Sequence, residues 1–176
     1  MARIVGYIAT SLDGFVADQN EQLGWLTPKY DSVELGEHSY ANFISHIRTI
    51  VMGRATYDWI NANSATWPYA GHRVIVVTSR PIVAPPTAVE TRSDVDALIA
   101  ELRALDDGDV WMAGGGKLQM AFMERGALDE IEIYLVAEVI GGGHPLFPPT
   151  GFSASPELVS AKAVGPGMVR LHYRFG

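Results

Sequence analysis

The sequence predicts one α/β domain whose central sheet is mixed, mostly parallel and sandwiched between helices. Three observations predict this fold class. Strand-like apolar runs alternate with segments of helical periodicity, residues 74–77 form a continuous β-branched run that suits a strand covered on both faces, and the C-terminal third alternates apolar with polar residues. The chain of 176 residues has the usual length of one domain, so a single domain over residues 1–176 is expected.

In the first two thirds of the chain, strands and helices are expected in turn. Strand-like runs occur at residues 3–9, 49–53, 72–78, 88–91 and 109–113. Shorter helices are expected at residues 40–47, 55–60 and 117–124. The clearest helix follows the fourth strand run. Ser93 is its expected N-cap, with Asp96 three residues later, and its apolar face consists of Val95, Leu98, Ile99, Leu102 and Leu105.

The pattern changes to period two after Gly126. Residues 131–135 and 169–175 each alternate apolar with polar side chains, which predicts antiparallel strands near the C-terminus. The strand Val169–Phe175 is expected to leave an open edge of the sheet. Pairing of this edge with a second copy of the chain would give a homodimer.

The composition excludes several classes of site. The chain has no cysteine, which rules out disulfides, thiolate nucleophiles and cysteine-bound metals, and its histidines and carboxylates show no metal-ligand spacing, so no metal is expected. A net charge of -7 disfavours a nucleic-acid binder, although a local basic pocket can still hold a phosphate. No apolar stretch is long enough for a membrane span or a signal peptide, so the expected location is the cytoplasm.

Three segments that directly follow predicted strands carry the chemistry of a phosphate site. Glycine amides and a helix N-terminus bind anions, arginine matches phosphate oxygens with its planar fork, and hydroxyls donate single hydrogen bonds. Because ligands of open α/β sheets bind beyond the carboxyl ends of strands, the segments together predict a phosphorylated dinucleotide. Each alone fits a turn, a cap or a surface charge equally well. The segments are Gly53-Arg54-Ala55-Thr56, Thr78-Ser79-Arg80-Pro81 and Gly114-Gly115-Gly116-Lys117.

At these positions the chain resembles the dihydrofolate-reductase-like family. It is more closely similar to the reductase domain of the bifunctional bacterial riboflavin-biosynthesis deaminase/reductase and its stand-alone relatives. The resemblance runs from Ile4 to Phe175 and includes the motifs Ser11-Leu12-Asp13-Gly14 and Gly141-Gly142-Gly143-His144-Pro145-Leu146-Phe147. It implies a three-layer α-β-α architecture with an eight-stranded sheet, and NADPH as the cofactor. Because relatives commonly form dimers, it also implies a homodimer, whose interface the sequence does not define.

The resemblance also implies roles for the residues of these motifs. Arg54, Ser79 and Arg80 would surround the adenosine 2′-phosphate, while Ala9 and Gly14 would border the nicotinamide. The preference for NADPH over NADH also has a physical reason, because an arginine pairs with a 2′-phosphate that a carboxylate would repel. The pyrophosphate would lie against Thr56, Gly114, Gly115, Gly116, Lys117 and Leu118, and Gly53 and Thr78 complete the cofactor motifs.

Hydride transfer also needs a proton source and a substrate pocket. Beyond Trp25, Asp31 has the offset nearest to that of the acid in dihydrofolate reductases, although Glu34 and Glu37 follow it and all three also suit the N-terminus of a helix. Asp13, in an Asp-Gly turn, is the second candidate catalytic residue. Trp25 and Tyr57 are expected on the substrate side, and both also suit core packing.

The sequence therefore predicts an NADPH-dependent reductase that transfers a hydride to a small heterocyclic substrate of pteridine or pyrimidine type. Two alternatives stay open. One is a 5-amino-6-(5-phosphoribosylamino)uracil reductase of riboflavin biosynthesis, which needs a basic pocket for the substrate phosphate. The other is a nucleotide-binding or assembly module that keeps the fold without turnover. The spare basic residues form no obvious cluster for a substrate phosphate: Lys29, Arg48, Arg73 and Lys117.

Overall fold

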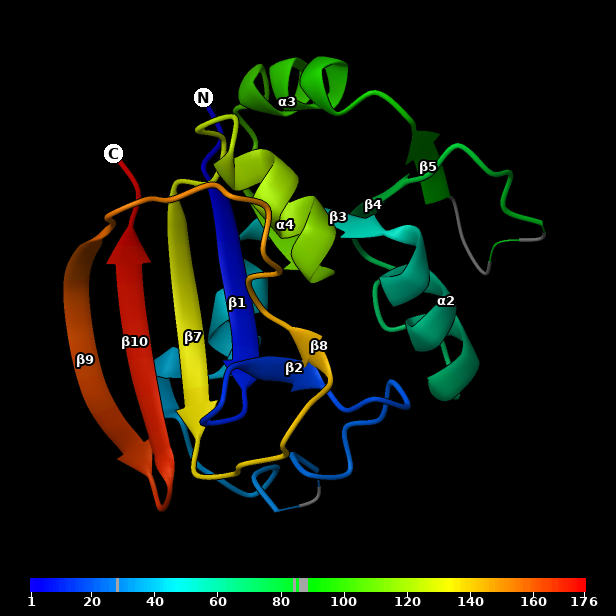
Figure 1. The fold of residues 1–176 in the computed structure, drawn as a ribbon. Helices are drawn as coiled ribbons and strands as arrows, with labels where there is room; N and C mark the ends of the chain where they lie inside the picture. The colour runs from blue at the N-terminus through cyan, green and yellow to red at the C-terminus, as the bar shows by residue number, and fades with distance from the viewer. Residues whose placement is uncertain (28, 84, 86–88) are drawn as a thin grey trace.

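The structure is a computed structural model that describes residues 1–27, 29–83, 85 and 89–176. Its central element is an eight-stranded sheet with the order β5-β4-β3-β6-β1-β7-β10-β9 (Figure 1). Neighbouring strands from β5 to β7 run parallel, whereas β10 is antiparallel to β7 and to β9. The strands are β1 (Ile4–Thr10), β3 (Ile47–Gly53), β4 (Arg73–Val77), β5 (Val89–Arg92), β6 (Asp109–Gly114), β7 (Glu130–Val136), β9 (Glu157–Gly165) and β10 (Met168–Arg174).

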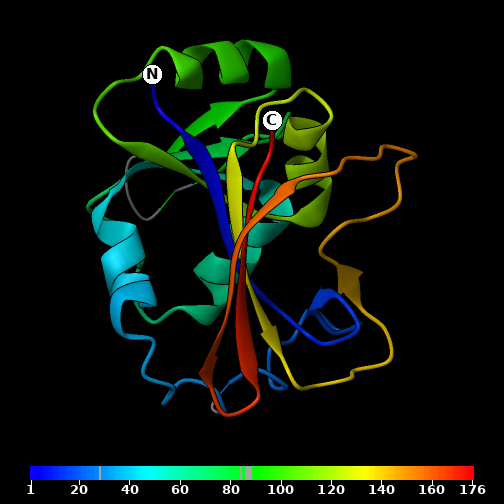
Figure 2. The same ribbon diagram turned by 90° about the vertical axis from the view of Figure 1, so that its left-hand side faces the viewer.

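Helices cover both faces of this sheet. Figure 2 looks at the sheet from its β9 side, with α1 and α4 on opposite faces. The arrangement confirms the predicted mixed, mostly parallel sheet of a three-layer α/β fold. The helices are η1 (Gly36–His38), α1 (Tyr40–Ser45), α2 (Arg54–Asn63), α3 (Val95–Arg103) and α4 (Gly116–Met123).

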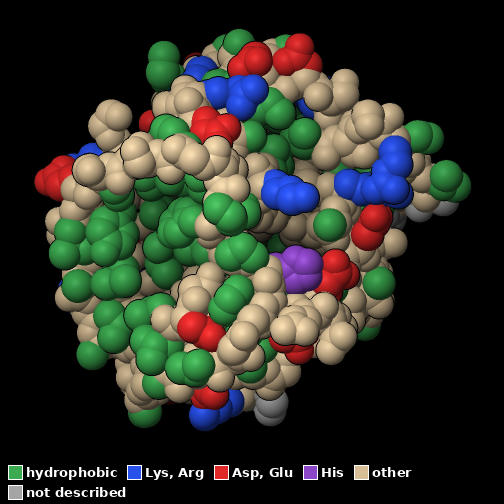
Figure 3. All heavy atoms as spheres, in the orientation of Figure 1, with side chains coloured by type: hydrophobic (Ala, Val, Ile, Leu, Met, Phe, Trp, Pro, Cys, Tyr) green, Lys and Arg blue, Asp and Glu red, His purple; other side chains and the backbone are tan. Residues whose placement is uncertain are grey.

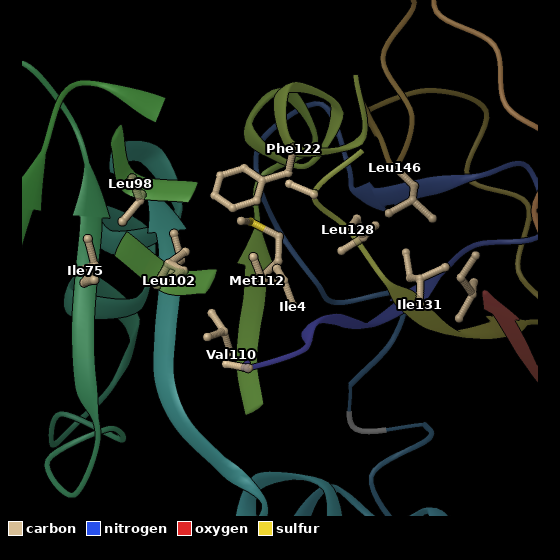
Figure 4. Close-up of a cluster of buried hydrophobic side chains, with 14 residues drawn as sticks. Ile4, Ile75, Leu98, Leu102, Val110, Met112, Phe122, Leu128, Ile131 and Leu146 are labelled. Carbon is tan, nitrogen blue, oxygen red and sulfur yellow. The ribbon is translucent and has the colours of Figure 1, made fainter. Parts of the chain in front are cut away.

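The larger core cluster fills the space between the sheet and the helices α3 and α4 (Figure 4). Leu98 and Leu102 of α3 and Phe122 of α4 are fully buried there. They pack over Ile4 and Met112 from the two central strands β1 and β6. Burial of this many large apolar side chains is the main favourable term in the folding free energy.

The burial of both faces of β4 explains why its sequence does not alternate apolar with polar residues. Val74 and Val76 belong to the core cluster under α1 and α2, whereas Ile75 belongs to the cluster under α3 and α4. All three side chains are at most 1% exposed. The prediction that this strand is covered on both faces is confirmed.

The C-terminal part of the sheet differs from the prediction. Strand β10, expected at the edge, lies between β7 and β9, so the edge on this side is β9. The sequence of β9 does not show the alternation that marks β7 and β10, because most of its side chains are exposed. The expected subunit contact along an open edge of residues 169–175 is therefore wrong.

Several element boundaries also differ. The helix that begins at Tyr40 ends at Ser45, and Ile47 is the first residue of β3, where it is buried. Helix α3 is capped by Asp94, whose side chain accepts a hydrogen bond from the Ala97 amide, in place of the expected Ser93. The proposed start of the fourth strand at Ala88 lies outside the described residues, and the strand is seen over Val89–Arg92.

Candidate functional site

Two helix N-termini meet at the carboxyl ends of β3 and β6, which are adjacent strands of the sheet. Helix α2 has Gly53 as its N-cap and α4 has Gly115, and neither cap offers a side chain to the first turn. A Cβ on Gly53 would lie 3.7 Å from the Gly115 nitrogen. The first-turn amides of two helices therefore point toward one place without side-chain acceptors, which is an arrangement that binds anions.

A cavity of about 230 Å³ opens at this edge of the sheet. Its walls come from β1, β6, the first turns of α2 and α4, and a small two-stranded sheet formed by β2 (Phe15–Ala17) and β8 (His144–Pro145). Most of the lining is apolar, and its ionisable side chains are Glu21 and His144. The lining residues are Ile8, Val16, Ala17, Glu21, Leu23, Ala55, Thr56, Trp59, Met112, Ala113, Gly114, Gly115, Gly116, Gln119, His144 and Leu146.

The three glycines of the triplet have different surroundings. Gly114 has a φ of +110°, which favours glycine, and its Cβ direction is open space. A Cβ on Gly115 would lie 3.5 Å from the Thr56 hydroxyl, across the gap between the two helix N-termini. A Cβ on Gly116 would lie 2.7 Å from the carbonyl oxygen of Pro145, so this glycine allows α4 to pack against the segment after β8. Gly114 and Gly115 face the ligand side, and Gly116 has a packing role.

The predicted arginines have different partners. The Arg54 Nε donates to both carboxylate oxygens of Asp58, and its Nη1 donates to the backbone carbonyls of Arg80 and Pro81. Arg54 therefore ties the loop after β4 to α2. The Thr78 hydroxyl accepts a hydrogen bond of 3.0 Å from the Arg80 amide and shapes the same loop.

The side chains of Arg80 and Lys117 form no ion pair with any residue of the described ranges, and both are exposed. Ser79, between Thr78 and Arg80, is exposed as well. Figure 3 shows basic side chains gathered toward the α2 side of this face. Lys117 lies in the first turn of α4, and Arg80 lies in the loop that Arg54 ties to the first turn of α2, so both cations are available to an anionic ligand at the paired helix N-termini.

The two predicted catalytic carboxylates do not line the cavity. Asp13 accepts hydrogen bonds from the backbone amides of Ile140 and Gly141. The pKa of Asp13 is lowered by its interaction with the Ser11 hydroxyl and by these amides, so its carboxylate holds the turn after β1 against the loop before β8. Asp31 is exposed in the turns that follow Trp25.

Four other predicted residues pack away from the cavity. Tyr57 is 3% exposed and packs beneath α2 against Trp67. Trp25 and Ala9 pack around the cluster of Tyr30 and Tyr134, and Leu118 packs on the larger core cluster. Strand β1 alternates between its two faces, so Ile8 lines the cavity and Ala9 does not. Gly14 lies at its margin, where its carbonyl accepts a hydrogen bond from the Leu146 amide.

Sequence reasoning missed the polar residues that the cavity does contain. Glu21 lies in a turn held by the Asp18 carboxylate and has a φ of 61°, which is the left-handed region. His144 pairs with Ala17 in the small sheet. Gln119 is 3% exposed, one turn into α4. No sequence signal marks the left-handed conformation of Glu21, whereas His144 belongs to the motif Gly141–Phe147, to which the sequence assigns no catalytic role.

The described residues include neither a metal site nor a membrane-spanning helix. No group of three or more His, Cys, Asp or Glu side chains in the described ranges is arranged to hold a metal ion. Within the same residues, none of the helices has the length and apolar character needed to cross a bilayer.

Comparison with known proteins adds a family and a fold. The profile of the RibD C-terminal domain matches residues 3–170. The uncharacterized protein YwjB of Bacillus subtilis (strain 168) is 31% identical over 173 residues, which cover 97% of each chain. A putative riboflavin biosynthesis protein from Shewanella sp. PV-4 superposes with a TM-score of 0.86 at 27% identity, covering 100% of this chain and 99% of the other. Dihydrofolate reductase from Enterococcus faecalis, solved with NADP(H), superposes with a TM-score of 0.69 at 19% identity. The superposition covers 99% of this chain and 96% of the reductase chain.

Proposed function

The chain belongs to the RibD C-terminal domain family and has the dihydrofolate-reductase-like fold, and from this premise we propose that it is an NADPH-dependent reductase of a small heterocyclic substrate. One observation carries the proposal. Two uncapped helix N-termini converge beside an apolar cavity, and two cations without ion-pair partners among the described residues flank them. A dinucleotide has the matching parts, which are a pyrophosphate, a 2′-phosphate and an apolar ring.

The residues present fit NADPH. The amides at Gly114 and Gly115 and the Thr56 hydroxyl would hold the pyrophosphate in the cradle between α2 and α4, which a side chain at Gly115 would fill. Arg80, with Ser79 beside it, would pair with the 2′-phosphate, and Lys117 would add charge near the pyrophosphate. Arg54 would position the Arg80 loop through its two backbone carbonyl contacts. The carboxylate of Asp58 holds Arg54 in that orientation.

The cofactor supplies a hydride when bound. The apolar walls formed by Ile8, Val16 and Leu146 would keep water from the reacting ring. An ionisable side chain that donates the proton has to lie at the cavity, and Glu21 and His144 are the two that line it. We propose that one of them supplies the proton in place of the sequence candidates Asp31 and Asp13. Both side chains are exposed to solvent.

The lining of the cavity favours a substrate without a phosphate group. Away from the glycine cradle at Gly114 and Gly115, the lining contains no lysine or arginine among the described residues, so a substrate phosphate there would have no cationic partner. This favours an uncharged pteridine-like or pyrimidine-like ring over 5-amino-6-(5-phosphoribosylamino)uracil. The likeness to a putative riboflavin biosynthesis protein keeps the latter as the second candidate substrate.

The test combines cofactor binding with turnover. NADPH binding is measured by quenching of tryptophan fluorescence, because Trp59 lines the cavity. NADPH oxidation is then followed with pterins, unphosphorylated aminopyrimidines and the phosphoribosylamino uracil. We expect tight NADPH binding and turnover with an unphosphorylated ring. Turnover of the phosphorylated compound alone would favour the riboflavin reductase, binding without turnover on any substrate would favour a nucleotide-binding module, and absence of NADPH binding would overturn the proposal.

A further inference from the structure

Gln119 is the one strongly buried polar side chain of the cavity lining in the described part of the chain. It is 3% exposed and lies on α4, where its backbone amide donates to the Gly115 carbonyl at 3.1 Å. Gln119 is therefore one helical turn from the N-terminus that faces the anion cradle. Buried amides in folded proteins are almost always hydrogen-bonded, so the partners of this one define its role.

The Gln119 side chain has unused hydrogen-bonding capacity. Its Nε2 donates to the Leu146 carbonyl at 3.5 Å, the long limit of a hydrogen bond. Its carbonyl oxygen receives no hydrogen bond from any residue that the structure describes, yet it is not among the fully buried side-chain atoms that lack a partner. That oxygen therefore opens onto the cavity. One acceptor, and a second N–H donor, are left for a ligand.

The neighbours of Gln119 define the kind of group that it can bind. Ile8, Val16 and Leu146 line the same cavity and are apolar, and the ionisable side chains Glu21 and His144 are exposed. A charged ligand group placed against a buried neutral amide would lose its hydration without gaining a counter-charge. A neutral group that has both an N–H donor and a carbonyl acceptor would satisfy the glutamine on both sides.

We propose that Gln119 binds the carboxamide of the nicotinamide and thereby fixes the orientation of the ring in the cavity. The inference rests on the proposed NADPH-dependent function. A primary carboxamide is the complement of a glutamine side chain, since each offers an N–H donor and a carbonyl acceptor. Gln119 lies one turn along α4 from the proposed pyrophosphate site and lines the apolar cavity that would receive the ring.

The experiment compares NADPH with its reduced 3-acetylpyridine analogue, in which a methyl ketone replaces the carboxamide and no N–H donor is left. Affinities are measured by tryptophan quenching, without any substrate. The wild-type protein is expected to bind NADPH about 5- to 50-fold more tightly than the analogue, the range for one hydrogen bond whose loss leaves a buried group unsatisfied. In Gln119→Leu this ratio is expected to fall several-fold toward one.

Control variants distinguish a specific role of Gln119 from a general effect on folding or nucleotide binding. Gln22→Leu makes the same change at an exposed glutamine outside the cavity lining and is expected to keep the wild-type ratio. Gln119→Met, which keeps the side-chain volume, replaces the leucine variant if that variant does not fold. An unchanged ratio in a folded Gln119 variant, or equal wild-type affinity for both nucleotides, overturns the role of Gln119 while leaving NADPH as the cofactor. Failure of the wild-type protein to bind either nucleotide overturns the proposed function and this inference with it.

Discussion

Gly116 and Pro145 are packed so closely that a Cβ on Gly116 would lie 2.7 Å from the Pro145 carbonyl oxygen and 2.9 Å from the Pro148 Cδ. Gly116→Ala is therefore expected to lower the free energy of unfolding by about 1–3 kcal/mol, the usual cost of overpacking. Denaturant unfolding checks this value. Gly115→Ala is the matched variant, because a methyl group there meets only the Thr56 hydroxyl at 3.5 Å.

Gly115→Ala is expected to affect binding more than stability. Replacing a glycine N-cap by alanine costs about 0.5–1 kcal/mol of stability. The methyl group would occupy the gap between the two helix N-termini, and NADPH affinity is expected to fall at least tenfold. If the two alanine variants lose stability and affinity in equal measure, the division of the triplet into ligand-facing and packing glycines is wrong.

Arg80 is predicted to set the preference for the phosphorylated cofactor. Arg80→Ala removes one charge-assisted interaction of about 1.5–3 kcal/mol, so NADPH affinity should fall roughly 10- to 150-fold while NADH affinity changes little. Fluorescence titration with both nucleotides measures the two affinities. Arg125→Ala is the control, because Arg125, just after α4, pairs with Asp96 of α3 and neither residue lines the cavity. An equal loss for NADPH and NADH would exclude a 2′-phosphate contact.

The proton donor is expected among the residues that line the cavity. Glu21→Gln and His144→Gln are compared with Asp31→Asn and Asp13→Asn, and the variant that removes the donor should lose about 10²- to 10⁴-fold in kcat while it still binds NADPH. We expect this loss in one of the first pair. A loss confined to Asp31→Asn would restore the residue that the sequence favoured. Asp13→Asn should instead lower thermal stability, because Asp13 accepts two backbone hydrogen bonds.

Glu90 predicts a dependence of stability on pH. Hydrogen bonds from Arg73 and Arg92 lower the pKa of Glu90 from 4.5 to about 2. Because the folded-state pKa is below the unfolded one, the stabilisation is complete above pH 4.5 and is lost as the pH falls toward 2. The Glu90 side chain is 39% exposed, so screening limits the contribution to about 1 kcal/mol.

Glu90→Gln should therefore reduce the free energy of unfolding by about 1 kcal/mol at neutral pH and have little effect near the folded-state pKa. Urea unfolding over this pH range measures the difference. Glu124→Gln, on an exposed glutamate outside the ion pairs of the described residues, is the matched control. A difference that stays constant as the pH falls would show that the charge of Glu90 is not responsible.

A homodimer is still predicted, with a different contact surface from the one expected. Figure 3 shows hydrophobic side chains gathered over β7, β9 and β10. Leu158 is 54% exposed and Val159 39% exposed on the edge strand β9. Analytical ultracentrifugation should give twice the chain mass of 19.1 kDa for the wild-type protein and for Val83→Lys, and a monomer for Leu158→Lys. A monomeric wild-type protein would contradict this prediction.

The sequence is sufficient to predict the parallel part of the sheet but not the strand at its C-terminal edge. Strands such as β4 are buried on both faces, so an apolar run marks them, whereas β9 is exposed and carries no such pattern. Ile8 lines the cavity where Ala9 was expected, and this difference has a related cause. A shift of one residue along a strand moves a side chain to the other face, and motif spacing alone does not determine that register.

The glycine triplet shows the same limit within the site. Its position after a strand and before a helix predicted an anion cradle, and the convergence of α2 and α4 supports that interpretation. The packing role of Gly116 depends on Pro145 and Pro148, which are distant in sequence. In the sequence, Gln119 does not differ from any other helical residue. Only its burial beside the cavity distinguishes it.

Strand β1 comes first in the chain but lies in the interior of the sheet, between β6 and β7. Ile4 pairs with Val110 and Val5 with Glu130, so both neighbours of β1 are synthesised long after it. Such non-local pairing makes folding slow, because a long loop must close before its contacts form. On the ribosome, most of the polypeptide has to emerge before this apolar segment can pair with its neighbours, and until then its apolar side chains are exposed to aggregation.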